Sequence, residues 1–190
     1  MGRLFESFDE AWEAFLAREE PLESFFDQFP DDGAAVTEGW LVIPPPEVKR
    51  EILRAQRALE DVRGLRIVPH HFLHLWLRGT HGPDLDELVE DGPFDVALER
   101  VGCFHTAVVA EVRSERLERA DAPSTYLPHV SLAYVELPTP AEDVRAVVRT
   151  LRERALGAWT VDELVRVRVP TSRTTVLEPW SVVERASLQR

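Results

Sequence analysis

The chain has 190 residues, of which 44% are hydrophobic, 29% are charged and one is cysteine. These values predict one soluble globular domain, and the single cysteine excludes an intrachain disulfide and a thiolate zinc site. The net charge of −12 disfavours a protein that coats DNA or RNA, although it permits a locally basic cleft for a small anion. The chain lacks a secretory signal and an apolar run long enough for a membrane span, so we expect a cytoplasmic protein without a membrane partner.

Residues 1–36 are expected to form a helical extension. Aromatic and aliphatic side chains recur at helical spacing over 5–16, and Ser7 with Glu10 matches a capping box. A second short helix is expected around 22–26, before a turn signal at 30–33. An aromatic stripe of this kind packs on a core or on a partner chain, so we consider a homo-oligomer formed through this aromatic helix.

Residues 37–190 predict an α+β domain. A helix over 48–59 is expected to end at Gly64, and a second helix is expected to run from a Thr139 cap to Gly157. Strands are expected over these ranges: 39–43, 69–77, 94–101, 104–112, 127–135, 164–169 and 176–188.

An internal repeat divides this domain into two lobes. The passages 40–64 and 133–157 each read as an extended segment, a Pro-x-Pro turn and an amphipathic helix ended by glycine. Each half also has one apolar, β-prone run that carries histidine after a proline, at 69–77 and 127–135. The repeat predicts two similar lobes about an approximate two-fold axis, with the two histidine strands facing each other across a central groove.

In the second run, His129 and Ser131 share one face because strand side chains alternate. Burying two polar side chains without partners would cost about 1–3 kcal/mol each, so we expect this face to open onto a cavity or ligand. The alternative is a core histidine and a serine bonded to a neighbouring backbone group. Tyr134 is expected on the opposite face, as packing.

In the first run, three leucines form an apolar face, so His74, Trp76 and Arg78 point the other way. Matching the two runs places His74 opposite His129. Arg78 is expected to bring positive charge to the groove, because guanidinium pairs well with phosphate, and a solvated surface position is the alternative. Arg166 and Arg168 are weaker candidates of the same kind, again with a solvated surface position as the alternative.

These residues resemble the 2H phosphoesterase superfamily, which includes bacterial 2'-5' RNA ligase-like proteins and cyclic phosphodiesterases. His129-Val130-Ser131 matches the His-x-Thr/Ser motif of that family, whereas in His74-Leu75-Trp76 a tryptophan replaces the hydroxyl residue. The resemblance covers roughly residues 39–190. It implies a bilobal α+β fold with pseudo-two-fold symmetry, in which antiparallel sheets flanked by helices surround a central groove.

The resemblance further implies a metal-independent phosphoesterase for 2',3'-cyclic phosphate or 2'-5' phosphodiester bonds of nucleotides or RNA ends. His74 and His129 would form an acid–base pair, since imidazole titrates near neutral pH, and no cofactor is expected. Ser131 would donate a hydrogen bond to a phosphate oxygen. Trp76 would stack on a base, fill the groove or block phosphate, and a tryptophan packed in the core is a further alternative.

Two other functions stay open. His70, His71 and His74 would suit a metal enzyme on a helix, but Pro69 and the apolar pattern indicate a strand on which these side chains diverge. The second is a catalytically weakened protein on the same fold that binds a nucleotide or an RNA end without turnover. Extended DNA binding is not expected of either.

Overall fold

The computed structural model describes residues 5–31, 36–77, 89, 92–119 and 127–189. The strands within these ranges are β1 (Val36–Val42), β2 (Leu65–Ile67), β3 (Leu75–Trp76), β4 (Phe94–Cys103), β5 (Ala107–Arg113), β6 (His129–Val135), β7 (Gly157–Val161), β8 (Glu163–Pro170) and β9 (Ser181–Ser187). Within the same ranges they form one curled antiparallel sheet in the order β7-β4-β5-β6-β3-β1-β8-β9, and β2 pairs with the far end of β6.

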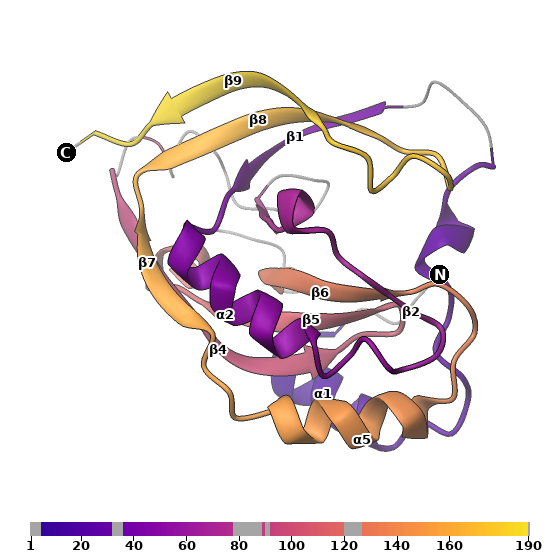
Figure 1. The fold of residues 1–190 in the computed structure, drawn as a ribbon. Helices are drawn as coiled ribbons and strands as arrows, with labels where there is room; N and C mark the ends of the chain where they lie inside the picture. The colour runs from indigo at the N-terminus through magenta and orange to yellow at the C-terminus, as the bar shows by residue number, and fades with distance from the viewer. Residues whose placement is uncertain (1–4, 32–35, 78–88, 90–91, 120–126, 190) are drawn as a thin grey trace.

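Helices lie on both sides of this sheet. They are α1 (Phe8–Leu16), η1 (Phe25–Gln28), α2 (Pro46–Gln56), η2 (His70–Phe72), α4 (Glu115–Arg119) and α5 (Ala141–Leu151), η marking a 3-10 helix. Figure 1 shows α2 in front of the strands β4, β5 and β6, and α1 behind them. Helix α5 packs against β4 and α1.

The sheet consists of two halves that join where β6 pairs with β3. One half is β7-β4-β5-β6 and the other is β3-β1-β8-β9, which confirms the predicted α+β fold with two lobes. Both passages of the repeat fold as a strand followed by a helix, β1 with α2 and β6 with α5. The predicted placement of the histidine strands is wrong in one respect: β3 and β6 are hydrogen-bonded neighbours in one sheet, not opposite walls of a groove.

Helix α2 connects the chain just before the first histidine run to the strand that carries the second. Its apolar side, including Ile52 and Ala55, is completely buried. At its last turn the Gln56 side-chain amide donates hydrogen bonds to the carbonyls of Val68 (2.9 Å) and Leu132 (2.8 Å). Because Val68 precedes the first histidine run and Leu132 lies in the second, one buried side chain fixes both backbones.

The N-terminal helix α1 covers its own chain. Ser7 Oγ accepts a hydrogen bond from Glu10 N (3.1 Å), as the predicted cap requires, while the Glu10 carboxylate accepts from Glu6 N (2.8 Å). Phe8 and Phe15 are buried within the molecule at 7% and 4% exposure. The aromatic face is thus occupied inside the chain, and a homo-oligomer through this helix stays a prediction that the packing does not support.

Three local predictions are wrong. The run 69–77 begins with the 3-10 turn η2, and only Leu75–Trp76 is strand. Thr139 does not cap α5, because its hydroxyl donates to the carbonyl of Leu137 (2.7 Å) and Pro140 occupies the cap position. Gly157 does not end that helix but begins β7, with a φ of 123° that favours glycine. Within the part of the chain that the structure describes, none of the helices has the length and apolar character of a membrane span.

Candidate active site

His74 directly precedes β3, and His129 is the first residue of the neighbouring strand β6. Leu75 pairs with Val130, and both side chains are fully buried on one face of the sheet. Continuing this antiparallel register by one residue in each direction places His74 across from Ser131, and Trp76 across from His129. The predicted direct opposition of His74 and His129 is therefore wrong. These two residues, called the histidine pair below, are diagonal neighbours on the same face, within reach of each other's rings.

Each imidazole is oriented by the carbonyl two residues before it. His74 Nδ1 lies 2.6 Å from the carbonyl oxygen of Phe72, and His129 Nδ1 lies 2.8 Å from that of Leu127. A carbonyl oxygen only accepts, so Nδ1 carries the proton in both rings. Nε2 is then the nitrogen that can accept or release a proton at the site. The same arrangement on both strands follows the two-fold character of the fold.

Both histidines are neutral at pH 7. Burial lowers the pKa of His74 to about 4, the hydrogen bond to Phe72 opposes this effect, and the nearby charge of His129 lowers the pKa further. Burial also lowers the pKa of His129, against the effect of its bond to Leu127. The mutual repulsion means that the histidine pair readily takes up at most one proton beyond the two on Nδ1, as an acid–base pair requires.

The Trp76 indole points away from His129. A Cβ added to Gly39 would lie within 2.9 Å of three atoms of the six-membered indole ring, so the ring rests directly on that glycine. Gly39 belongs to β1, on the side of β3 opposite to β6. The indole therefore extends over β1 and away from His129 and Ser131. This direction argues against the alternative in which Trp76 blocks a phosphate group at the histidine pair.

Aromatic rings enclose both imidazoles. The His74 ring makes edge contacts with Phe72 (5.1 Å between centroids) and Trp180 (5.2 Å), and lies 5.9 Å from Trp76. The His129 ring makes an edge contact with Phe104 at 5.1 Å. Phe104 and Trp180 are distant in sequence from both motifs, and the sequence analysis missed them because only the fold brings them here.

The predicted cations are not at the site within the described residues. Arg78 lies outside them. Arg166 and Arg168 pair with Glu38 at 2.8 and 2.5 Å and are exposed. Leu41 of β1 pairs with Val165 of β8 on one side and with Trp76 of β3 on the other, so these three side chains share one face of the sheet. Arg166 follows Val165 along β8 and therefore points to the opposite face. The solvated surface position considered for these two arginines is the one observed.

A buried ion network adjoins His129. Cross-strand pairing aligns Arg100 with Glu111 and Glu111 with His129, which places all three on one face. The Glu111 carboxylate accepts hydrogen bonds from Arg100 (2.9 Å) and from the buried Arg152. Asp9 of α1 also contacts Arg100 at 3.0 Å. The arginines neutralise Glu111, so its charge is compensated before a phosphate approaches His129. No motif in the sequence signals this network.

Tyr134 also lies on the site face, contrary to the prediction. On β5, Ala107 and Val109 point the same way, and their cross-strand partners are Tyr134 and Ser131. These partners are three positions apart instead of two because β6 bulges at this point, where Val108 pairs with Ala133 and Val109 with Ser131. The bulge reverses the alternation that the sequence prediction assumed. His129, Ser131 and Tyr134 therefore follow one another along a single face.

The histidine cluster of the metal alternative does not assemble. His70 and His71 lie in the turn η2 with exposed side chains, and His71 Nε2 is 3.3 Å from the carbonyl of Leu177. Among the described residues, no three His, Cys, Asp or Glu side chains come together in a way that would hold a metal ion.

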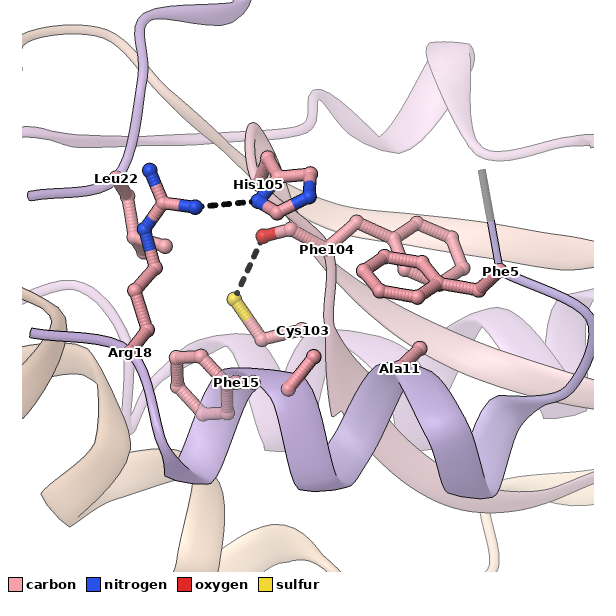
Figure 2. A pocket seen from close by; sticks show the side chains of 9 residues that line it. Phe5, Ala11, Phe15, Arg18, Leu22, Cys103, Phe104 and His105 are labelled. Carbon is pink, nitrogen blue, oxygen red and sulfur yellow. Dashed lines mark hydrogen bonds between the residues drawn. The ribbon is translucent and has the colours of Figure 1, made fainter. Parts of the chain in front are cut away.

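A small cavity under α1 contains the single cysteine (Figure 2). The Cys103 thiol donates a hydrogen bond to the carbonyl of Phe104 (3.2 Å), and burial raises its pKa well above the ordinary value. Arg18 and His105 also line this cavity, with Arg18 Nη1 2.5 Å from His105 Nδ1. Cys103 is thus a buried, unreactive side chain.

Comparisons with known proteins give a match in structure only. No protein-family profile matches the chain, and no curated protein sequence matches it. TT0787 of Thermus thermophilus aligns with a TM-score of 0.58 and 22% identity over 80% of this chain and 97% of its own. E. coli LigT in complex with 3'-AMP aligns with a TM-score of 0.53 and 16% identity over 80% of this chain and 97% of its own. A phosphoesterase aligns with a TM-score of 0.55 and 15% identity over 80% of this chain and 98% of its own. The likeness to these proteins shows a shared fold.

Proposed function

We propose that this chain, which has the fold expected of a 2H phosphoesterase, is a metal-independent phosphoesterase for 2',3'-cyclic phosphate or 2'-5' phosphodiester bonds of nucleotides or RNA ends. The observation that supports this most strongly is that the two rings of the histidine pair have the same hydrogen-bond arrangement. Each ring is fixed through Nδ1 by the carbonyl two residues upstream, and each has Nε2 as its reactive nitrogen. Two matched imidazoles on one face suit a reaction that takes one proton and gives another.

Hydrolysis of a 2',3'-cyclic phosphate illustrates the chemistry. A neutral Nε2 removes a proton from water while the water oxygen bonds to phosphorus. The bond from phosphorus to one ribose oxygen breaks, and the protonated second imidazole gives its proton to that oxygen. The products are a nucleoside monophosphate and a histidine pair with the proton exchanged between rings. Which of His74 and His129 is the base depends on the direction of the reaction.

The bound substrate would allow the imidazole that acts as general acid to be protonated. Burial lowers both pKa values below the ordinary 6.5 without ligand, so at neutral pH each ring carries only its Nδ1 proton and neither is an imidazolium. A negatively charged phosphate beside the rings stabilises an imidazolium and raises the pKa of the ring that faces the leaving oxygen. The Ser131 hydroxyl, across from His74, would donate a hydrogen bond to a non-bridging oxygen and stabilise the charge that develops in the transition state.

The nucleoside would lie on the aromatic side of the site. Trp76 and Trp180 are half-buried on the β3 side of the histidine pair, and a base stacks favourably on such rings. Arg78 comes two positions after the end of β3 in the sequence and is proposed as a phosphate-binding cation. The structures of E. coli LigT with ATP, NADP+ and 3'-AMP support a nucleotide as the ligand class.

The test is a product assay in the presence of a chelator. Purified protein is incubated with 2',3'-cyclic AMP and with a 2'-5'-linked dinucleotide in EDTA, and products are separated by chromatography. We expect conversion of at least one substrate and unchanged rates without EDTA. His70→Ala, which alters an exposed histidine close to the site, is the matched control and should retain the rate. Turnover that appears only with added metal would refute the proposal.

One observation favours the binding protein as a second candidate. Trp76 occupies the position of the first-motif hydroxyl, so one of two phosphate donors expected in the family is missing. That candidate predicts binding of 2',3'-cyclic AMP without products and an affinity that His74→Ala barely changes. Calorimetric titration beside the product assay separates the two functions.

A further inference from the structure

The ion network beside His129 holds more positive charge than its buried carboxylate balances. Arg100 and Arg152 both bind Glu111, whose side chain is 1% exposed. The second anion is Asp9 of α1, which lies 3.0 Å from Arg100 Nη1 and 3.7 Å from Arg152 Nη2. The Asp9 side chain is 73% exposed. Two guanidinium groups therefore share one anion fixed in the sheet and one anion at the surface.

The arginine next to the core is held in place by the chain itself. Arg152 is only 8% exposed, and its Nη1 donates to the carbonyl of Val101 (3.1 Å) as well as to Glu111. Its guanidinium group also lies over the Trp12 ring, 4.5 Å from the centroid. Gly102 leaves room for this arrangement, because a Cβ there would lie 2.9 Å from the Glu111 carboxylate. A cation ordered in this way binds an anion without first losing side-chain freedom.

Arg100 has a donor that the network does not use. Its Nε donates to Glu111 at 2.9 Å, and its Nη1 contacts Asp9. Among the described residues, none provides a hydrogen-bond partner for its buried Nη2. A guanidinium group presents its N–H groups as a planar fork that matches the oxygens of a phosphate. The network can therefore donate more hydrogen bonds than the Asp9 carboxylate accepts.

The network lies close to the histidine pair. Arg100 and His129 are the cross-strand partners of Glu111 on its two sides, so about 10 Å separates their Cα atoms at about 4.8 Å per strand. The start of α1 approaches the same place, because Phe8 stacks on Phe104 with ring planes 9° apart and Phe104 contacts the His129 ring. A ribose that carries a phosphate on its 3' side and another on its 5' oxygen can span such a distance.

We propose that Arg100 and Arg152 form a second phosphate subsite, occupied by Asp9 in the free chain. The inference rests on the proposed function: while the 2' or 3' phosphate of the substrate lies at the histidine pair, the subsite binds the phosphate on the 5' oxygen of the same ribose. That group is a monoester in a nucleotide and a diester in an RNA end. Because the Asp9 side chain is exposed, it can turn into solvent and leave both guanidinium groups to the phosphate.

Calorimetric titration of the unaltered chain and Asp9→Asn tests the subsite. The ligands are adenosine 3',5'-bisphosphate, the dinucleotide ApAp, which ends in a 3' phosphate, and 3'-AMP. Asparagine keeps the size of the side chain but removes the charge that competes with phosphate. We expect Asp9→Asn to tighten binding of at least one of the first two ligands about two- to fivefold, with 3'-AMP changed less than about 1.5-fold. A gain for the bisphosphate identifies the monoester, and a gain for ApAp identifies the diester.

Two further variants serve as controls. Asp27→Asn alters another exposed aspartate that is paired with an arginine, Arg173 at 2.6 Å, and should change the affinity for none of the three ligands. Arg100→Gln in the Asp9→Asn background should cancel the gain, provided that circular dichroism shows a folded protein.

A purely structural role for Asp9 predicts the opposite result. If Asp9 only holds α1 on the sheet, Asp9→Asn lowers the thermal midpoint and tightens the binding of no ligand, which overturns the inference. An equal gain for 3'-AMP also overturns it, because that gain reflects the net charge of the protein. The proposed function is judged separately, by the product assay. A chain that forms no products but shows the selective gain lacks the proposed activity and retains the subsite, whereas a chain that turns over substrate without the gain retains the activity and lacks the subsite.

Discussion

Replacing Gly39 by alanine should change stability in opposite directions, depending on the residue at position 76. In the unaltered chain a Cβ at position 39 would lie within 2.9 Å of three indole atoms of Trp76, a distance that side-chain carbons do not tolerate. The indole must leave β1, and His129 is its cross-strand neighbour on the other side. We expect overpacking to destabilise the protein by about 1–3 kcal/mol. Since a domain of this size loses about 2–4 °C per kcal/mol, the thermal midpoint should fall by about 2–12 °C.

Gly39→Ala is expected to stabilise the protein when the indole is absent. Gly39 does not adopt a positive φ, so alanine fits its backbone conformation without strain. In a Trp76→Ala background, Gly39→Ala should therefore stabilise the protein by about 0.4–1 kcal/mol, through the lower entropy of the unfolded chain. Denaturant unfolding of the four proteins in the cycle measures both values.

Displacement of the Trp76 indole should also change the activity. Gly39→Ala should lower kcat/KM in the unaltered background, because the indole moves along the site face toward His129. If Gly39→Ala leaves stability unchanged in both backgrounds, Trp76 does not rest on β1, and the reasoning that the site face is open to phosphate fails.

Three further changes test other parts of the structure. The pH profile of kcat/KM should peak below pH 6.5, since the singly protonated form of the histidine pair dominates between two pKa values that burial has lowered, and a maximum above pH 7 would contradict this. Gly64→Ala should cost at least about 1 kcal/mol in urea unfolding, because φ is 88° and the new Cβ would overlap Thr139 Oγ1. Glu111→Ala should cost about 3–5 kcal/mol by leaving buried arginine charge unpaired, against less than about 1 kcal/mol for the exposed Glu38→Ala.

Much of the fold could be predicted from the sequence because local pattern and tertiary packing agree. The spacing of Ile52 and Ala55 indicates the buried side of α2, and alternation in the run from His129 gives the strand that carries the second motif. The two-lobed α+β fold then follows from repeated strand–helix units. Ser7 predicted the start of α1 for the same reason, since a helix cap is a local interaction.

The site was harder to predict because its geometry depends on register. The sequence places His74 and His129 in equivalent motifs, but only the pairing of Leu75 with Val130 shows that the rings are diagonal neighbours. The bulge in β6 leaves no mark in the sequence, and strict alternation therefore assigned Tyr134 to the wrong face. Trp180 reaches His74 through a tertiary contact that no local pattern encodes.

The most direct test of the central claim compares single-turnover rates of product formation from 2',3'-cyclic AMP in EDTA for the unaltered chain, His74→Ala and His129→Ala. Loss of a general acid or base costs about 100-fold to 10,000-fold, and we expect each substitution alone to lower the rate by at least the smaller factor while circular dichroism shows a folded protein. The double variant should be little slower than either single one, because the two rings act as a unit. Retention of the rate by either single variant would contradict the claim that this chain uses the two histidines as one acid–base pair.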